Sequence, residues 1–198
     1  MKIVCKSTYL LTMKKLFYTL LVSVLSFSAL QAQTTTIGDV ELKNTVTVDG
    51  SSLQLNGAGI RSKYFLSLYV GSLYVPSKIS DAKQVLSTDQ KMIQLDIISS
   101  LISKEKMEDT IKEGFSNSMN GNTAPLQKEI DSFIAVFSEE VEVGDIFQFI
   151  TNGSKLKALK NGKELTSVDN EEFNKVLFGI WLGDKPADKK LKSKMLGK

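Results

Sequence analysis

The sequence contains no histidine, and its only cysteine is Cys5, close to the N-terminus. A Ser-His-Asp triad therefore cannot be assembled, and most zinc sites lack their usual His and Cys ligands. A thiolate nucleophile and a disulfide are excluded as well once Cys5 is lost with the leader described below. We accordingly predict no metal site and no cofactor.

The N-terminal segment has the three parts of a secretory signal. A short basic stretch, Met13-Lys14-Lys15, runs into the apolar residues 16–27 and then into the small-residue end at residues 28–32. The apolar run contains several Ser and Thr residues and is shorter than the roughly 20 apolar residues that cross a bilayer. We predict that residues 1–32 are a signal peptide cut after Ala32, with Met13 as the true start. The protein is then periplasmic or secreted, and an uncleaved anchor is the alternative.

Removal of this leader changes the charge balance. The whole sequence has 25 Lys and Arg residues against 22 Asp and Glu residues, but four of the lysines and none of the acids lie within residues 1–32. The remaining chain has a net charge of −1, so its apparent basicity comes mostly from the leader. Composition therefore predicts no nucleic-acid partner, and no stable membrane span is expected after cleavage.

Residues 33–198 suit a single domain with a sizeable core. Strand signals, which are alternating apolar residues or β-branched and aromatic runs, occupy residues 40–48, 53–55, 60–75, 92–98, 145–150 and 155–160. Helix signals, which are apolar residues three or four apart, occupy residues 80–86, 103–119, 126–137, 169–183 and a short stretch containing Leu191, Met195 and Leu196. Tight-turn signals lie at Asp49-Gly50, Asn152-Gly153 and Asn161-Gly162.

Many tight turns between short strands argue against a parallel βαβ sheet. The pattern predicts an α+β fold in which a large antiparallel sheet is covered on one face by a layer of helices. Such a sheet leaves a cleft beside the helices where a small apolar ligand can lie.

Three local details follow from the same pattern. Residues 60–75 are apolar on both faces, which indicates central strands with a bend or bulge near Gly71. The spacing of Asp169 and Glu172 fits a capping box at the start of the last long helix. Residues 56–59, Asn-Gly-Ala-Gly, lack the lysine and the following helix of a phosphate-binding loop, so a turn is predicted there.

Two segments resemble the chalcone isomerase-like superfamily. Residues 55–75 resemble its glycine–arginine strand segment, and residues 180–186 look like the closing signature of its bacterial members, with Leu191-Lys192 and Leu196-Gly197 following. The resemblance extends over essentially all of residues 33–198. It implies the open-faced β-sandwich of that family, with a large antiparallel sheet under a layer of helices.

The resemblance also implies a site. Plant enzymes of the family close a chalcone into a flavanone and hold the substrate with an arginine, whose position matches Arg61. Their other active-site positions fall at Leu68 or Tyr69, Ser103, Thr110 and Gly179 or Ile180. A site reduced to one cation can bind an anion but lacks most of the groups that would order a reacting molecule.

Non-enzymatic relatives bind fatty acids, using the same arginine for the carboxylate. We therefore predict a non-catalytic binder of a small amphipathic carboxylate such as a fatty acid, with Arg61 as its anchor. Tyr69 is the predicted second donor, because it lies eight residues from Arg61 and shares a face of the strand with it if no bulge intervenes. One alternative is a chalcone-type intramolecular lyase that uses Arg61. The other is a structural envelope protein without a ligand, in which Arg61 pairs with Asp96 or Glu113. Trp181 is predicted to be a core residue.

Overall fold

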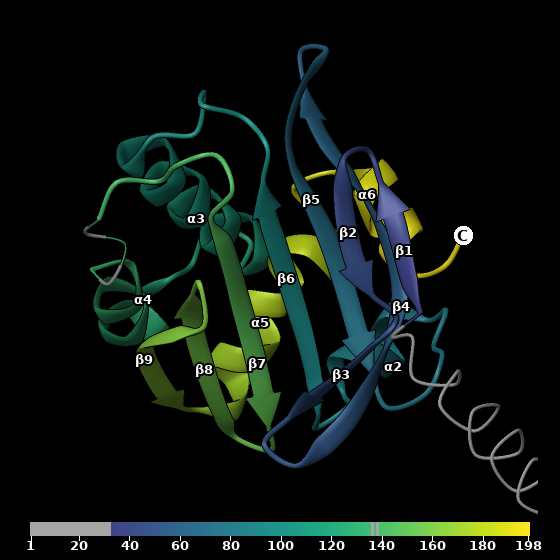
Figure 1. Cartoon of the computed structure of the whole chain (residues 1–198). Coiled ribbons are helices and arrows are strands. Elements are labelled where there is room, and N and C mark those ends of the chain that lie inside the picture. The colour runs from purple at the N-terminus through teal and green to yellow at the C-terminus, as the bar shows by residue number, and fades with distance from the viewer. Residues whose placement is uncertain (1–32, 136, 138) are drawn as a thin grey trace, which may run out of the picture. The chain divides into compact units, whose positions relative to one another are not determined.

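An antiparallel sheet organises the part of the chain that the structure, a computed structural model, describes: residues 33–135, 137 and 139–198 (Figure 1). The predicted leader, residues 1–32, lies outside the described residues. The strands of the sheet are hydrogen-bonded in chain order, each to the next. They are β3 (Thr45–Val48), β4 (Ser51–Lys63), β5 (Leu66–Val75), β6 (Lys91–Ile97), β7 (Ile146–Asn152), β8 (Lys155–Lys160) and β9 (Lys163–Asp169).

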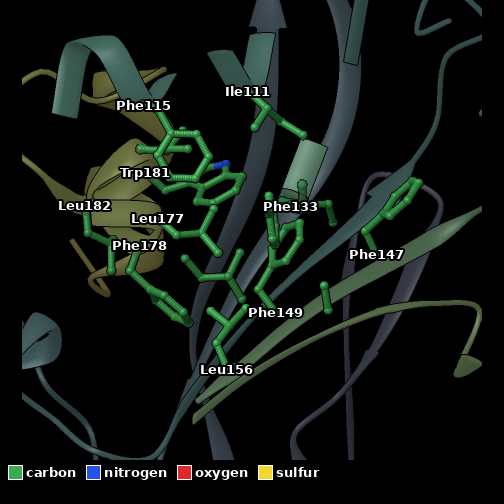
Figure 2. Packing of buried hydrophobic residues seen from close by; sticks show 14 of the residues in the cluster. Ile111, Phe115, Phe133, Phe147, Phe149, Leu156, Leu177, Phe178, Trp181 and Leu182 are labelled. Carbon is green, nitrogen blue, oxygen red and sulfur yellow. The ribbon is translucent and has the colours of Figure 1, made fainter. Parts of the chain in front are cut away.

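The helices pack on one face of this sheet. They are α2 (Ala82–Leu86), α3 (Lys104–Ser118), the short 3-10 turn η1 (Ala124–Leu126), α4 (Gln127–Ile134), α5 (Glu171–Leu182) and α6 (Lys189–Met195). Their apolar stripes bury aromatic side chains against the sheet, and Phe133 of α4 meets Phe115 of α3 and Phe149 of β7 with ring centroids 6.1 and 5.9 Å apart (Figure 2). The predicted α+β fold with helices over an antiparallel sheet is confirmed.

A separate two-stranded hairpin, β1 (Thr34–Ile37) and β2 (Val40–Lys43), lies over the opposite face of the sheet (Figure 1). Its Leu42 is buried with Val70, Tyr74 and Met92, which point away from the helices. This second, smaller core was not predicted. Residues 40–48, expected as one strand, are divided at Asn44 between the hairpin and the main sheet.

The helix starts follow ordinary capping chemistry. Ser103 begins α3, as predicted, and its hydroxyl accepts from the Lys106 amide. The cap of α5 is Asn170, one residue later than the predicted Asp169, because the Asn170 side chain accepts from the amides of Glu172 and Phe173. None of the described helices is both long enough and apolar enough to cross a membrane.

Two predictions about residues 55–75 need correction. The bend or bulge expected near Gly71 lies at Leu68 of β5, where the register shifts between Arg61 and Ser62, while Gly71 itself pairs with Gly59; a second shift lies between Leu55 and Gly57. The expected turn at residues 56–59 is instead part of β4, where the small residues admit α6: a Cβ on Gly57 would lie 2.1 Å from the Lys194 carbonyl oxygen. The glycines therefore serve close helix–strand packing.

Lys91 gives the fold a measurable pH dependence. Its side chain is buried at the start of β6, with the amine over the Phe178 ring and donating to the Thr88 carbonyl, and this burial lowers its pKa from 10.5 to about 8. Below pH 8 the ammonium is charged in both the folded and the unfolded chain, and its desolvation lowers the stability of the folded state. Between about pH 8 and 10.5 the unfolded chain binds more protons, so stability rises with pH.

We expect the free energy of unfolding of the native chain, measured relative to Lys91→Met, to rise by about 3 kcal/mol between pH 7.5 and pH 10.5. The methionine variant keeps the length of the side chain and removes the charge. Urea unfolding of both proteins at several pH values measures the difference. A constant difference across this range would contradict the desolvated ammonium.

Candidate functional site

A bulge in the β4–β5 hairpin sets the position of Arg61. Ser62 pairs with Ser67, but Arg61 pairs with Tyr69, so Leu68 is the extra residue of β5. Without this insertion Arg61 would face Leu68, since the hairpin closes with Lys63 opposite Leu66. The bulge therefore places the guanidinium and the phenol side by side on the helix-covered face of the sheet.

The Tyr69 hydroxyl is held by two donors. Trp181 Nε1 of α5 donates to it over 2.9 Å, and Arg61 Nη1 lies 3.4 Å away. The guanidinium carbon also lies 5.5 Å from the centre of the Tyr69 ring. A phenol has two acceptor sites and one proton, and both neighbours are donors only. The hydroxyl proton is therefore directed to an acceptor other than these two groups.

A cavity of about 430 Å³ opens beside this pair, between the end of the β4–β5 hairpin and α3. Its wall is more apolar than polar in total, although four charged side chains besides Arg61 line it. The lining residues are Arg61, Lys63, Tyr64, Leu66, Leu68, Tyr69, Leu101, Ile102, Lys106, Met107, Asp109, Thr110 and Glu113. A volume of this size is in the range of small-molecule pockets.

Two smaller spaces adjoin Arg61. A more polar cavity of about 250 Å³ shares Arg61, Lys63, Thr110 and Glu113 and extends toward Lys185. A narrow crevice of about 20 Å³ leads from Arg61 toward Phe149 and Trp181. The crevice is too small for a ligand, because Trp181 stacks on Phe149 at 5.5 Å and fills the core there. An apolar chain anchored at Arg61 thus fits only the larger cavity.

The sequence matches the chalcone isomerase-like family over residues 34–197. The chain belongs to the chalcone isomerase-like family. A solved structure, the fatty-acid binding protein AtFAP1 of Arabidopsis thaliana, has the same fold with a TM-score of 0.59 and 15% sequence identity; the alignment covers 77% of this chain and 95% of AtFAP1. No curated protein gives a sequence match.

Within this chalcone isomerase-like fold, the carboxylates proposed as partners of Arg61 do not bind it. Arg61 is in none of the ion pairs formed by the described residues. Glu113 lines the same cavities as Arg61. Asp96 pairs with Val70 in the sheet and so points to the other face, where Gln94 donates to both its oxygens and burial raises its pKa.

The positions aligned with the plant enzymes separate in space. Thr110 lines all three spaces around Arg61, whereas Ser103 caps α3 and is not among the lining residues. Gly179 packs against the Ser118 hydroxyl. Among residues 33–135, 137 and 139–198 no cluster of three acidic, His or Cys side chains could hold a metal ion.

Sequence reasoning missed the role of Trp181. Its indole is buried in the core, as predicted, but its N–H also fixes the Tyr69 hydroxyl. A buried Trp needs an acceptor for this N–H, so the single tryptophan of the sequence was a sign that a polar group lies in the core. Nothing local identifies that group, because the two residues are 112 positions apart.

Proposed function

We propose that the protein is an exported carrier of a small amphipathic carboxylate, with a fatty acid as the first candidate. Residues 1–32 act as a cleaved leader, and residues 33–198 hold the ligand. The observation that carries this proposal is an arginine that lines a largely apolar cavity and forms no ion pair with a carboxylate of the described residues. The fatty-acid binding neighbour AtFAP1 supports the same ligand class.

The ligand carboxylate is held by the Arg61 guanidinium and the Tyr69 hydroxyl. An ionised carboxylate accepts strong, charge-assisted hydrogen bonds from a guanidinium fork. The Tyr69 proton adds a donor, since Trp181 and Arg61 occupy the acceptor side of that oxygen. The acyl chain lies along Leu66, Leu68 and Met107 in the larger cavity.

The proposal is tested on purified residues 33–198. Native mass spectrometry should find a co-purified fatty acid, and calorimetric titration of the delipidated protein should show binding of a fatty acid but much weaker binding of the alcohol of equal chain length. Failure to bind any fatty acid would refute the carrier. Ring closure of a chalcone by the same preparation would instead support the lyase. If neither fatty-acid binding nor ring closure is found, the structural envelope protein is supported.

Export is tested by N-terminal sequencing of protein from the cell envelope, which should begin at Gln33.

Tyr69→Phe tests the second donor. We expect about tenfold weaker fatty-acid binding, because one hydrogen bond to a charged group is lost. We also expect stability without ligand to fall by about 1 kcal/mol, since the buried Trp181 N–H loses its acceptor. Calorimetry and urea unfolding measure the two effects. Unchanged affinity with reduced stability would assign the hydroxyl a structural role only.

A further inference from the structure

The turn between β4 and β5 has residues that do not suit its backbone. In the described chain, three two-residue hairpin turns have positive φ at both central positions: Asp49-Gly50 (48° and 80°), Asn161-Gly162 (52° and 79°) and Tyr64-Phe65 (49° and 69°). The first two have the Asp-Gly and Asn-Gly pairs that such type I′ turns favour. The third places two bulky aromatic residues in the left-handed region, where a side chain is strained.

The same two aromatic residues project into solvent. Tyr64 is 83% exposed and Phe65 is fully exposed, and Leu66 and Leu101 beside them are 51% and 43% exposed. We call Tyr64, Phe65, Leu66 and Leu101 the apolar tip. The β4–β5 hairpin extends past the end of β6, because β6 pairs with β5 only from Tyr69 onward (Figure 1). The backbone strain and the exposed apolar side chains both lower the stability of the folded domain. This indicates that the turn is kept for contact with another molecule.

The apolar tip adjoins the mouth of the ligand cavity. Tyr64, Leu66 and Leu101 belong both to the tip and to the cavity wall. The Lys63 amine lies 6.0 Å from the centre of the Tyr64 ring, and the Lys106 amine donates to the Leu101 carbonyl over 3.0 Å. Lysines beside aromatic and leucine side chains are the arrangement found where proteins meet the lipid headgroup layer.

We propose that the apolar tip inserts into the surface layer of a lipid bilayer, so that the cavity opens directly onto the acyl chains. This inference rests on the proposed carrier function, since it supplies the route by which a fatty acid enters and leaves. A protein partner fits less well: a stable interface takes about 20 residues from each side, whereas the tip consists of four side chains. A few apolar side chains can insert into a lipid bilayer without a surface of complementary shape.

Insertion of apolar side chains, and not net charge, drives the contact. Asp109 and Glu113 also line the cavity, so they offset Lys63 and Lys106 near an anionic surface. Binding should therefore fall only slightly as salt is raised, unlike the attachment of a polybasic segment.

The test compares three forms of residues 33–198 in flotation with vesicles made of equal parts phosphatidylethanolamine and phosphatidylglycerol. In the first variant, Tyr64→Asn with Phe65→Gly gives the tip the turn residues found at Asn161-Gly162. It should fold with a raised Tm and bind vesicles at least tenfold more weakly than the native chain. In the control, Val143→Ser removes an apolar side chain that is 58% exposed elsewhere on the surface, and vesicle binding should not change.

A spectroscopic measurement locates the inserted residue. The only tryptophan, Trp181, is buried, so brominated lipids should not quench the native protein but should quench the added indole of Phe65→Trp. Absence of vesicle binding by the native chain, or equal binding by the Asn-Gly variant, overturns the proposal. A native dimer that dissociates in the Asn-Gly variant also overturns it, in favour of a second copy of the chain.

Fatty-acid titration without vesicles separates this inference from the carrier function. The single variant Phe65→Gly should keep its affinity for a fatty acid in solution, because Phe65 is the one tip residue outside the cavity wall and Arg61, Tyr69 and the lining residues are unchanged. If the native chain and the Asn-Gly variant bind vesicles equally, the membrane inference alone is refuted. If the native chain binds no fatty acid, the carrier function is refuted.

Discussion

Arg61→Ala is expected to weaken fatty-acid binding about a hundredfold, which corresponds to roughly 2.7 kcal/mol. The guanidinium is proposed to donate to the ligand carboxylate, and a hydrogen bond between charged groups contributes about 1.5–3 kcal/mol. Titration calorimetry of the delipidated native and variant proteins measures the change. The alcohol of the same chain length serves as a control ligand, whose weak binding should be nearly unaffected because it lacks the carboxylate.

Arg61→Lys distinguishes the geometry of the guanidinium from its charge. A lysine keeps the positive charge but loses the planar fork, so we expect roughly a tenfold loss, between the native chain and Arg61→Ala. The free energy of unfolding of Arg61→Ala distinguishes a binding role of Arg61 from a structural role. Since Arg61 forms none of the ion pairs of the described chain, its removal should change the free energy of unfolding by less than about 1 kcal/mol. A large loss of stability with unchanged affinity would instead favour the structural envelope protein.

The fold was predictable because the signals that define it are local. The four-residue spacing of Met107, Ile111 and Phe115 predicts the buried face of α3, and all three side chains are buried in the core. Asn-Gly and Asp-Gly pairs locate two hairpin turns, at Asp49-Gly50 and Asn161-Gly162. Each of these signals lies within a few residues of the structure it specifies.

The hairpin turn at Tyr64-Phe65 could not be predicted, because its residues carry no local turn signal. Its residues are typical of a strand interior, so the run from residue 60 to residue 75 was read as central strands with a bend or bulge near Gly71, and no turn was predicted at Tyr64-Phe65. The backbone has positive φ there against local preference, which the flanking pairs of β4 and β5 impose. Local pattern also could not show that residues 40–43 form a hairpin across the other face of the sheet, because periodicity does not identify the partner strand.

At the candidate site, the resemblance indicated Arg61 and the spacing indicated Tyr69, and the structure brings these two together. The expectation was that they share a face if no bulge intervenes, yet the bulge at Leu68 is what places them opposite each other. A one-residue bulge depends on the packing of the whole sheet and has no sequence signal of its own here. Trp181 was missed as a site residue for the same reason, since its contact with Tyr69 joins distant elements.

Gly57→Ala is expected to lower the free energy of unfolding by about 3 kcal/mol, at the upper end of the range for overpacking. The added Cβ would lie 2.1 Å from the Lys194 carbonyl oxygen and 3.0 Å from the Met195 oxygen, both backbone atoms at the end of α6. Backbone cannot rotate away as a side chain can, so α6 must move. Asn56 would then lose the hydrogen bond of 2.8 Å from its amide to the Met195 carbonyl.

Two neighbouring glycines supply a graded control for urea unfolding. A Cβ at Gly59 meets the Lys194 side chain at 2.8 Å, and one at Gly71 meets only the Leu191 methyl groups at 3.1 and 3.2 Å and the Tyr69 ring at 3.5 Å. Side chains can give way, and alanine also restricts the unfolded chain, so Gly71→Ala should cost about 1 kcal/mol or less and Gly59→Ala an intermediate amount. Equal effects at Gly57 and Gly71 would show that α6 is not docked through the glycines of β4, and these glycines would then require a different explanation.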